Sequence, residues 1–256
     1  MKSLHLSALE AFPLVKPGDD LPDLIWRSLT ENNLQIQSGD ILVIAQKVVS
    51  KAENRYRDLS KVIPSDNAEK LSRITGKDPR FVELVLQESR SVLRAKTNTL
   101  IVEHRLGFVC ANAGIDHSNV DGLGNNTEDW MLMLPEDPDL SAARIRESLE
   151  KETGCEIGVM IIDSHGRSWR MGIVGVAIGY SGVPGLVDMR GHKDLFGYEL
   201  KVTQIAAADE LAASASLLMG QADESLPVVL ARGFPYPLRE SSFRELIRPS
   251  DQDLFR

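Results

Sequence analysis

Oxygen-bearing side chains follow two of the most apolar segments of the chain. Asp163 and Ser164 come directly after the apolar run 157–162, and residues 112–119 (Asn-Ala-Gly-Ile-Asp-His-Ser-Asn) follow the apolar run 108–111. An unpaired carboxylate is costly inside a core, so we expect Asp163 to project from the end of a strand, where ligands often bind. Carboxylate, carbonyl and hydroxyl oxygens are the ligands that Mg²⁺ and Mn²⁺ prefer. Each segment alone is equally compatible with a turn.

Two further segments could contact an anionic ligand. Lys47 and Lys51 lie four residues apart beside a predicted buried strand and could offset phosphate charge, although lysines on a solvated face are commoner. The polar segment 219–227 joins a predicted helix to a predicted strand, which by itself is typical of an ordinary connection. The sequence contains no P-loop, no dinucleotide-binding fingerprint and no nucleophile elbow. The common motif classes of enzyme are therefore excluded.

Composition restricts the partners of the protein. The net charge is -8, from 29 basic and 37 acidic residues, and aromatic residues make up 5% of the chain. An acidic surface repels phosphate backbones, so we expect no nucleic-acid partner. No apolar stretch approaches the roughly 18 residues of a membrane helix. The two cysteines, Cys110 and Cys155, have no metal-ligand spacing and sit in apolar contexts, so we predict a cytoplasmic protein with no membrane partner.

Hydrophobic periodicity and capping residues predict the elements that must position these side chains. We expect helices at 21–31, 65–76, 78–86, 141–153 and 206–219, and strands at 4–15, 41–45, 100–102, 108–111, 157–162, 200–205 and 227–231. The glycines of 172–183 indicate close backbone packing, and 121–129 is predicted to be an exposed loop. Helices and strands are interleaved without a repeating βαβ rhythm, which favours a mixed α/β fold of the α+β type.

Seven segments of the chain recur, in this order, in one family of enzymes. They are 12–15 (Phe-Pro-Leu-Val), 46–53 (Gln-Lys-Val-Val-Ser-Lys-Ala-Glu), 112–119, 163–167 (Asp-Ser-His-Gly-Arg), 193–197 (Lys-Asp-Leu-Phe-Gly), 208–212 (Ala-Asp-Glu-Leu-Ala) and 218–223 (Leu-Met-Gly-Gln-Ala-Asp). The Asn-x-Gly-Ile-Asp and Asp-Ser-x-Gly-Arg blocks together are the most specific. On these segments the chain resembles the coenzyme F420-0:L-glutamate (γ-glutamyl) ligases over nearly its whole length.

The resemblance implies a metal site and a GTP site. Asp116 and Asp163 match ligands of one divalent ion, and Ser164 and Gln221 match ligands of a second; the ions would be Mg²⁺ or Mn²⁺, with K⁺ as an optional further ion. Lys51, Asp116 and Asp163 are the catalytic candidates. The positions that match the GTP site are Phe12, Pro13, Leu14, Val15, Gln46, Lys47, Lys51, Asn119, Met219, Gly220, Gln221, Ala222, Asp223, Glu224, Ser225 and Leu226.

The resemblance also implies an architecture and a reaction. The expected fold is an unusual α/β arrangement that forms an intertwined homodimer, with residues 1–256 as one catalytic unit that could comprise two subdomains, and with no C-terminal nitroreductase-like domain. The implied reaction is phosphoryl transfer from GTP to the carboxylate of F420-0, followed by attack of L-glutamate on the acyl phosphate.

Two questions stay open at the level of sequence. Arg167 and Arg170 could bind a carboxylate or phosphate bidentately, and an ion pair with a nearby acidic residue is about as probable. The same chemistry could act on a different carboxylate acceptor, because loops such as 121–129 can reshape a pocket. A nucleotide-binding homologue without catalysis is the alternative from another class.

Overall fold

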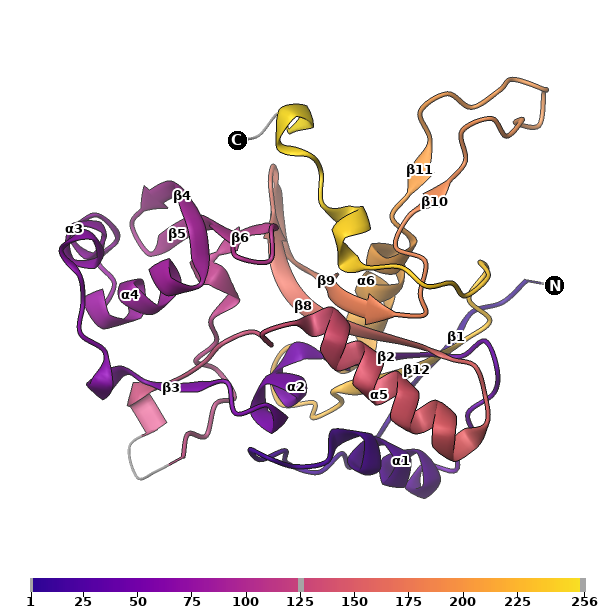
Figure 1. Cartoon of the computed structure of the whole chain (residues 1–256), viewed down its shortest axis with the longest axis horizontal. Coiled ribbons are helices and arrows are strands. Elements are labelled where there is room, and N and C mark those ends of the chain that lie inside the picture. Colours follow the sequence, from indigo (N-terminus) through magenta and orange to yellow (C-terminus); the bar gives the residue numbers. More distant parts are fainter. Residues whose placement is uncertain (1, 124–126, 254–256) are drawn as a thin grey trace.

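A five-stranded sheet forms the centre of the larger lobe (Figure 1). The computed structural model describes residues 2–123 and 127–253. The strand order is β1 (His5–Ala8), β12 (Val228–Arg232), β2 (Ile41–Ala45), β8 (Gly158–Arg167) and β9 (Arg170–Ser181). Strands β2 and β8 are parallel, and the other neighbours are antiparallel. The expected mixed α/β class is confirmed.

Helices cover both faces of this sheet. Helix α5 (Pro138–Thr153) and helix α6 (Ala207–Met219) both pack on β9, and α1 (Leu21–Glu31) packs on α5. The expected close packing occurs at two glycines of β9: a Cβ on Gly175 would lie 2.6 Å from a carbonyl oxygen of α6, and one on Gly179 would lie 2.3 Å from Pro138 of α5. Strand β2 is apolar throughout and buried at four successive positions, as expected of a strand covered on both faces.

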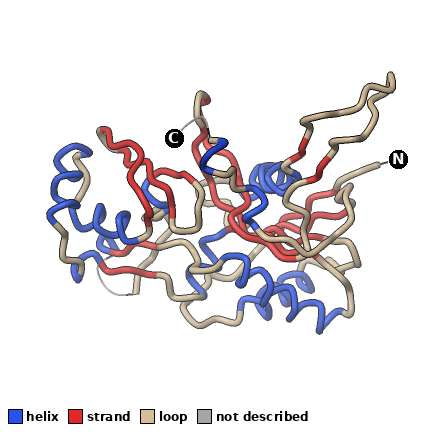
Figure 2. The backbone as a smooth tube through the Cα atoms, turned by 45° about the horizontal axis from the view of Figure 1, so that its top comes forward, coloured by secondary structure: helices blue, strands red, loops and turns tan. Residues whose placement is uncertain are grey.

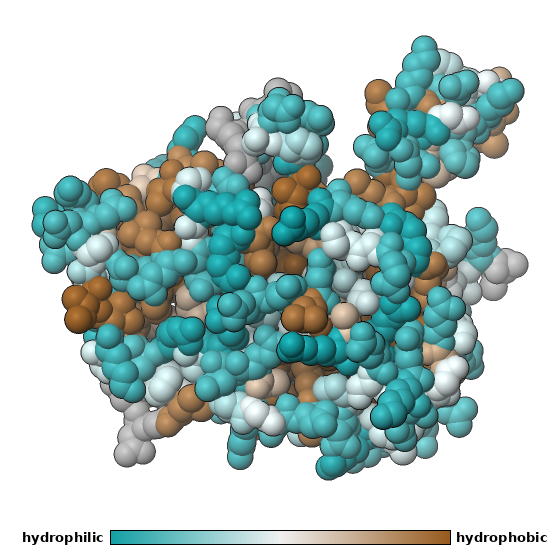
Figure 3. All heavy atoms as spheres, viewed as in Figure 1, coloured by the Kyte–Doolittle hydropathy of each residue, from teal (hydrophilic) through white to brown (hydrophobic). Residues whose placement is uncertain are grey.

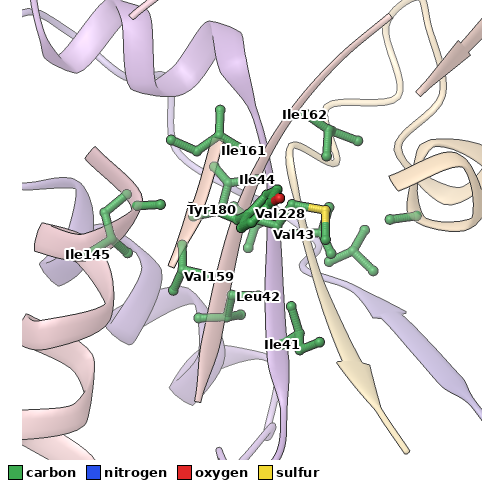
Figure 4. Packing of buried hydrophobic residues seen from close by; sticks show 14 of the residues in the cluster. Ile41, Leu42, Val43, Ile44, Ile145, Val159, Ile161, Ile162, Tyr180 and Val228 are labelled. Carbon is green, nitrogen blue, oxygen red and sulfur yellow. The ribbon is translucent and has the colours of Figure 1, made fainter. Parts of the chain in front are cut away.

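The side chains of β2, β8 and β12 form the main core, which Figure 4 shows from close by. Ile44, Val159, Ile161 and Val228 have no exposed surface, and the Tyr180 ring of β9 closes the cluster. Burial of one such side chain stabilises the fold by about 1.5–3 kcal/mol. The core therefore fixes the positions of β2 and β8. The polar residues that follow the apolar parts of these strands belong to the candidate site.

A smaller lobe contains a second sheet and its own core. Strands β4 (Ser89–Lys96), β5 (Thr99–His104) and β6 (Val109–Ala111) are antiparallel, with α3 (Asp66–Thr75) and α4 (Pro79–Gln87) packed beside them. A separate apolar cluster that includes Val85 and Leu100 fills this lobe. The short ribbon of β3 (Tyr56–Asp58) and β7 (Trp130–Leu132) lies beside it. Helix α2 (Gln46–Ala52) follows β2 without a break.

An arm protrudes from the body between β9 and α6. Its base is the two-stranded pair β10 (Val187–Asp188) and β11 (Gln204–Ile205), and the chain between them extends away from both lobes (Figures 1 and 2). Apolar and hydrophilic side chains are mixed on its surface (Figure 3). Leu195 and Phe196, near the tip, are 97% and 95% exposed.

Capping residues explain why most of the predicted helix boundaries are confirmed. The Ser65 and Asp78 side chains accept hydrogen bonds from the first turns of α3 and α4, and Gly76 and Gly154 end α3 and α5 in the left-handed conformation. The predicted start of α5 at residue 141 was wrong. Asp137 caps this helix and Pro138 occupies its first turn, so it begins three residues earlier.

Three strand predictions were wrong in extent. Strand β8 does not end at residue 162: it continues through Arg167 because β9 pairs with it along this length, so Asp163 lies within the strand. Of 200–205 only 204–205 is strand, and of 4–15 only 5–8. Strands β3, β4, β7, β9 and β10 were not predicted as strands, although close backbone packing was expected of 172–183 in β9. Of the predicted loop 121–129, residues 124–126 lie outside the described residues, and 127–129 form a short 3-10 helix.

No helix within residues 2–123 and 127–253 combines the length and apolar character that crossing a membrane requires.

Candidate functional site

Helix α2 places two side chains against Asp116. The Gln46 amide Nε2 donates a hydrogen bond to Asp116 Oδ2 at 2.5 Å, and Ser50 Oγ donates to Gln46 Oε1 at 2.9 Å, which fixes the amide orientation. The Lys47 Nζ lies 3.4 Å from Asp116 Oδ1. Gln46 is buried, because α2 starts at the end of a strand that is itself buried. Both oxygens of Asp116 therefore face polar groups of α2.

The backbone of the segment 112–119 holds Asp116 in place. Asp116 exchanges two backbone hydrogen bonds with Leu132 of β7, at 2.9 and 2.8 Å. Asn112 Oδ1 accepts a hydrogen bond from the backbone N–H of Leu100, which attaches the start of the segment to β5. Lys47 Nζ donates to the carbonyl and hydroxyl oxygens of Ser118, each at 3.1 Å. The segment is thus attached to both lobes.

The loop 219–226 closes the site from the side of α6. Gly220 ends that helix with φ at 71°, and a Cβ at this position would collide with the Glu224 carboxylate. The Asn119 amide Nδ2 donates to the carbonyl oxygen of Ala222 at 2.9 Å, and Ser164 Oγ donates to Gln221 Oε1, also at 2.9 Å. The structure therefore brings the segments around 46, 116, 163 and 221 together, although they are far apart in sequence.

Asp163 and Ser164 leave β8 in opposite directions, because successive side chains of a strand point to opposite faces. Ser164 faces Gln221. Asp163 and His165 share the other face, where His165 Nε2 lies 3.0 Å from Asp163 Oδ2. The four predicted metal ligands consequently form two groups, with Asp116 and Asp163 in one and Ser164 and Gln221 in the other.

Burial and the neighbouring carboxylate raise the pKa of Asp116 to about 6. Burial is the larger cause; the Lys47 ammonium lowers the pKa, and the Asp163 carboxylate raises it further. Two interacting carboxylates beside one ammonium leave negative charge uncompensated, and a divalent cation would offset it. The donor set therefore fits the ion that the resemblance implies. No group of three or more His, Cys, Asp or Glu residues suited to a metal occurs in the described part of the chain, so other oxygens must complete its coordination.

Lys51 points toward a different carboxylate. Its Nζ lies 3.6 Å from Asp121 Oδ1, and the Tyr56 hydroxyl donates to the same oxygen at 3.1 Å. Burial, together with the Asp121 charge, raises the pKa of Tyr56, so its hydroxyl stays protonated and can donate. The Lys51 side chain is only 12% exposed. Its charge is therefore held beside Asp121, one turn of α2 away from Lys47 and Asp116.

The remaining predicted nucleotide contacts divide into core and surface residues. Phe12, Val15 and Met219 are buried, whereas Pro13 and Leu14 are exposed. The exposed members of the loop 219–226 are Gln221, Ala222, Asp223, Glu224 and Ser225, while Gly220 and Leu226 are half-buried. A hydrogen bond from the Gly18 N–H to the Ala52 carbonyl attaches the segment after Val15 to the end of α2. The buried members can shape this part of the chain, and the exposed and half-buried ones have surface that a ligand can reach.

Two contacts of the site were missed at the level of sequence. Ser118 lies in one of the seven recurring segments, but no role was predicted for it; none was predicted for His165, which contacts Asp163. The spacing of His165 from Asp163 was the available signal, since residues i and i+2 of a strand share a face. The wrong prediction that the strand ends at residue 162 removed that signal.

Arg167 and Arg170 lie opposite each other at the exposed end of the β8–β9 hairpin. Arg167 Nη2 donates to the carbonyl oxygen of Met171 at 3.3 Å. At about 3.3 Å per strand residue, Arg167 is about 13 Å along β8 from Asp163. Their role in recognising an anion stays a prediction.

Comparison with known proteins agrees with this arrangement of segments. The family model described as F420-0:Gamma-glutamyl ligase matches residues 11–233. The chain belongs to this family. It is 46% identical to the Coenzyme F420:L-glutamate ligase of Methanothermobacter thermautotrophicus over 99% of both chains. It is 47% identical to the protein of the same name from Methanocaldococcus jannaschii, over 95% of this chain and 94% of the relative. The Archaeoglobus fulgidus relative of that name is 42% identical over 97% and 94%. The resemblance of the seven segments is thereby confirmed.

Proposed function

We propose that this protein is a GTP-dependent ligase that joins L-glutamate to coenzyme F420-0 by an amide bond. Membership of the ligase family and the names of the full-length relatives support the ligase activity and both substrates. The observation that carries the proposal is the Asp116 carboxylate held by Gln46 and Lys47, with the Asp163 carboxylate near enough to raise its pKa and the loop 219–226 tied to the same segment through Asn119. This is the combination of anionic and cationic groups that phosphoryl transfer requires.

The reaction proceeds in two balanced steps. A carboxylate oxygen of F420-0 attacks the γ-phosphorus of GTP, the bond to the β-phosphate oxygen breaks, and GDP leaves. The α-amine of glutamate then attacks the acyl carbon, phosphate leaves with the C–O electron pair, and the amine loses a proton. Both steps depend on positioning and charge neutralisation.

The residues of this chain have separable roles in that reaction. Asp116 and Asp163 would hold one divalent ion, and Ser164 and Gln221 a second; when bound, these ions supply charge stabilisation to the transferring phosphoryl group. Lys47 provides a fixed ammonium beside the carboxylates, while Lys51 keeps a second positive charge nearby. The Asn119 amide holds the loop 219–226, whose exposed backbone lies where it can contact the nucleotide.

Release of GDP tests the proposal. Wild-type protein with GTP, F420-0, L-glutamate and Mn²⁺ releases GDP and yields a product heavier by glutamate residues. Omission of F420-0 abolishes GDP release, and omission of L-glutamate prevents sustained turnover because the acyl phosphate is not consumed. Asp116→Asn and Asp163→Asn each reduce turnover by at least about 10²–10³-fold, because charge stabilisation is a dominant part of such catalysis. Asp66→Asn, at an exposed position of α3, is the matched control and keeps full activity.

The outcomes separate the alternatives. GDP release with a different carboxylate acceptor and none with F420-0 would assign the same chemistry to another substrate. Nucleotide binding without turnover on any acceptor would identify a non-catalytic homologue. Near-full activity of Asp163→Asn at limiting Mn²⁺ would refute the metal assignment.

A second copy of the chain is the proposed partner of the protruding arm. Leu195, Phe196 and Val202 on the arm are each at least 85% exposed, as are Trp169 and Met171 at the end of the β8–β9 hairpin. Apolar groups exposed at this density commonly mark an interface, and the sequence resemblance implies an intertwined homodimer. Light scattering after size exclusion should give the mass of a dimer. Phe196→Asp should shift it to a monomer, and a wild-type monomer would refute the proposal.

A further inference from the structure

A series of contacting rings, His165, Phe108 and His104, connects the candidate metal site to the smaller lobe. The His165 ring lies 5.3 Å from the Phe108 ring, centroid to centroid, and Phe108 stacks on His104 at 4.9 Å with only 4° between the ring planes. Phe243 closes this series from the side, edge-on to Phe108 at 5.7 Å. His165 therefore has little freedom to change its rotamer.

The His165 ring is hydrogen-bonded to the Asp163 carboxylate. Nε2 of the ring lies 3.0 Å from Oδ2, and the two side chains are only 13% and 12% exposed. A carboxylate oxygen accepts hydrogen bonds and a ring N–H donates them, so this contact fits donation from the His165 Nε2. The bond occupies Oδ2 and leaves Oδ1 of Asp163 available to another partner.

We infer that His165 is a positioning residue for Asp163: packed against Phe108, it holds Oδ2 in one place and leaves Oδ1 to bind a divalent cation together with Asp116. The inference rests on the metal site of the proposed function and adds a residue that touches neither substrate nor ion. A hydrogen bond to a ligating carboxylate commonly changes metal affinity 10- to 100-fold when it is lost.

Two substitutions separate the hydrogen bond from the packing. His165→Phe keeps an aromatic ring against Phe108 and removes the donor. His165→Gln removes the ring and keeps an N–H donor near the position of Nε2. His5→Phe, at an exposed position of β1, is the control.

Isothermal titration of each variant with Mn²⁺ alone measures affinity without turnover. The expected result is an affinity at least about 10-fold weaker in His165→Phe, within about threefold of wild type in His165→Gln, and unchanged in His5→Phe. Thermal melting within 3 °C of wild type would show that His165→Phe keeps the packing. A merely structural role predicts the reverse order, with the Gln variant weaker than the Phe variant.

Each outcome has a distinct meaning. Wild-type affinity in His165→Phe overturns the positioning role, provided that Asp163→Asn loses Mn²⁺ binding in the same assay. If wild type binds no Mn²⁺, or if Asp163→Asn binds it as well as wild type, the metal site of the proposed function fails and the role of His165 falls with it. If the Phe variant does not fold, weakened Mn²⁺ binding in a folded His165→Gln overturns the proposal.

Discussion

Replacement of Glu88 by glutamine should destabilise the protein through a buried charge cluster at the junction of the lobes. Glu88 follows α4, is 13% exposed, and accepts from Arg105 Nε at 2.8 Å and Arg55 Nη2 at 3.3 Å. The His104 Nε2 lies 3.6 Å away. Arg55 and Arg105 also donate to carbonyl oxygens of residues 134–136, on the way to α5. The carboxylate therefore pairs with two guanidinium groups that fix one lobe against the other.

The size of the effect follows from the pKa of Glu88. Burial acts to raise this pKa, but the nearby His104 ring, the hydrogen bond from Arg105 and the charges of both arginines outweigh it and lower the value from 4.5 to about 2. At about 1.4 kcal/mol per pH unit, this difference corresponds to about 3 kcal/mol of stability at pH 7. Glu88→Gln keeps the side-chain volume and loses this contribution, so its melting temperature should fall by about 6–12 °C.

The stabilisation by Glu88 should decrease as the pH falls. The pKa is lower in the folded state, so the stabilisation is complete above pH 4.5 and is lost as the pH falls toward 2. The difference in unfolding free energy between wild type and Glu88→Gln should therefore shrink from about 3 kcal/mol at pH 7 to about 2 kcal/mol at pH 3.5. Urea denaturation at both pH values measures it, with Glu31→Gln, at an exposed position of α1, as the control.

Two results would contradict this role of Glu88. A loss below about 1 kcal/mol at pH 7 would mean that the arginines find other acceptors and that the cluster contributes little. A loss that is equal at pH 7 and pH 3.5 would mean that packing, and not the charge of Glu88, is responsible.

Two further substitutions test the packing and the loop contacts. Gly175→Ala should lower the free energy of unfolding by about 1–3 kcal/mol, because the new Cβ would lie 2.5 Å from Ser216 Cβ of α6. At Gly166 a Cβ would have nothing within 4 Å, so the melting temperature of Gly166→Ala should be close to that of wild type. Equal melting temperatures of the two variants would contradict this account. Asn119→Gly keeps the backbone conformation with φ at 57° but loses the hydrogen bond to Ala222. It should raise the KM for GTP about three- to tenfold with kcat and melting temperature nearly unchanged, and an unchanged KM would separate this contact from nucleotide binding.

The sequence was most informative where a local signal acts within a few residues. Ser65, Asp78 and Gly76 mark helix ends because their hydrogen bonds and φ values are local. The run 41–45 was recognisable as a buried strand because apolar side chains must leave water wherever the strand lies. The sequence also supplied the order of the seven segments, from which the family followed.

The meeting of Asp116 with Lys47, and of Ser164 with Gln221, was decided by the fold alone. These contacts depend on the pairing of β2 with β8 and on the place where α6 ends, which no local signal encodes. The role of His165 was hidden for the same reason: only the pairing of β8 with β9 extends the strand past Asp163 and puts both side chains on one face. Residue types set the chemistry that is available, and long-range strand pairing selected which of those residues meet.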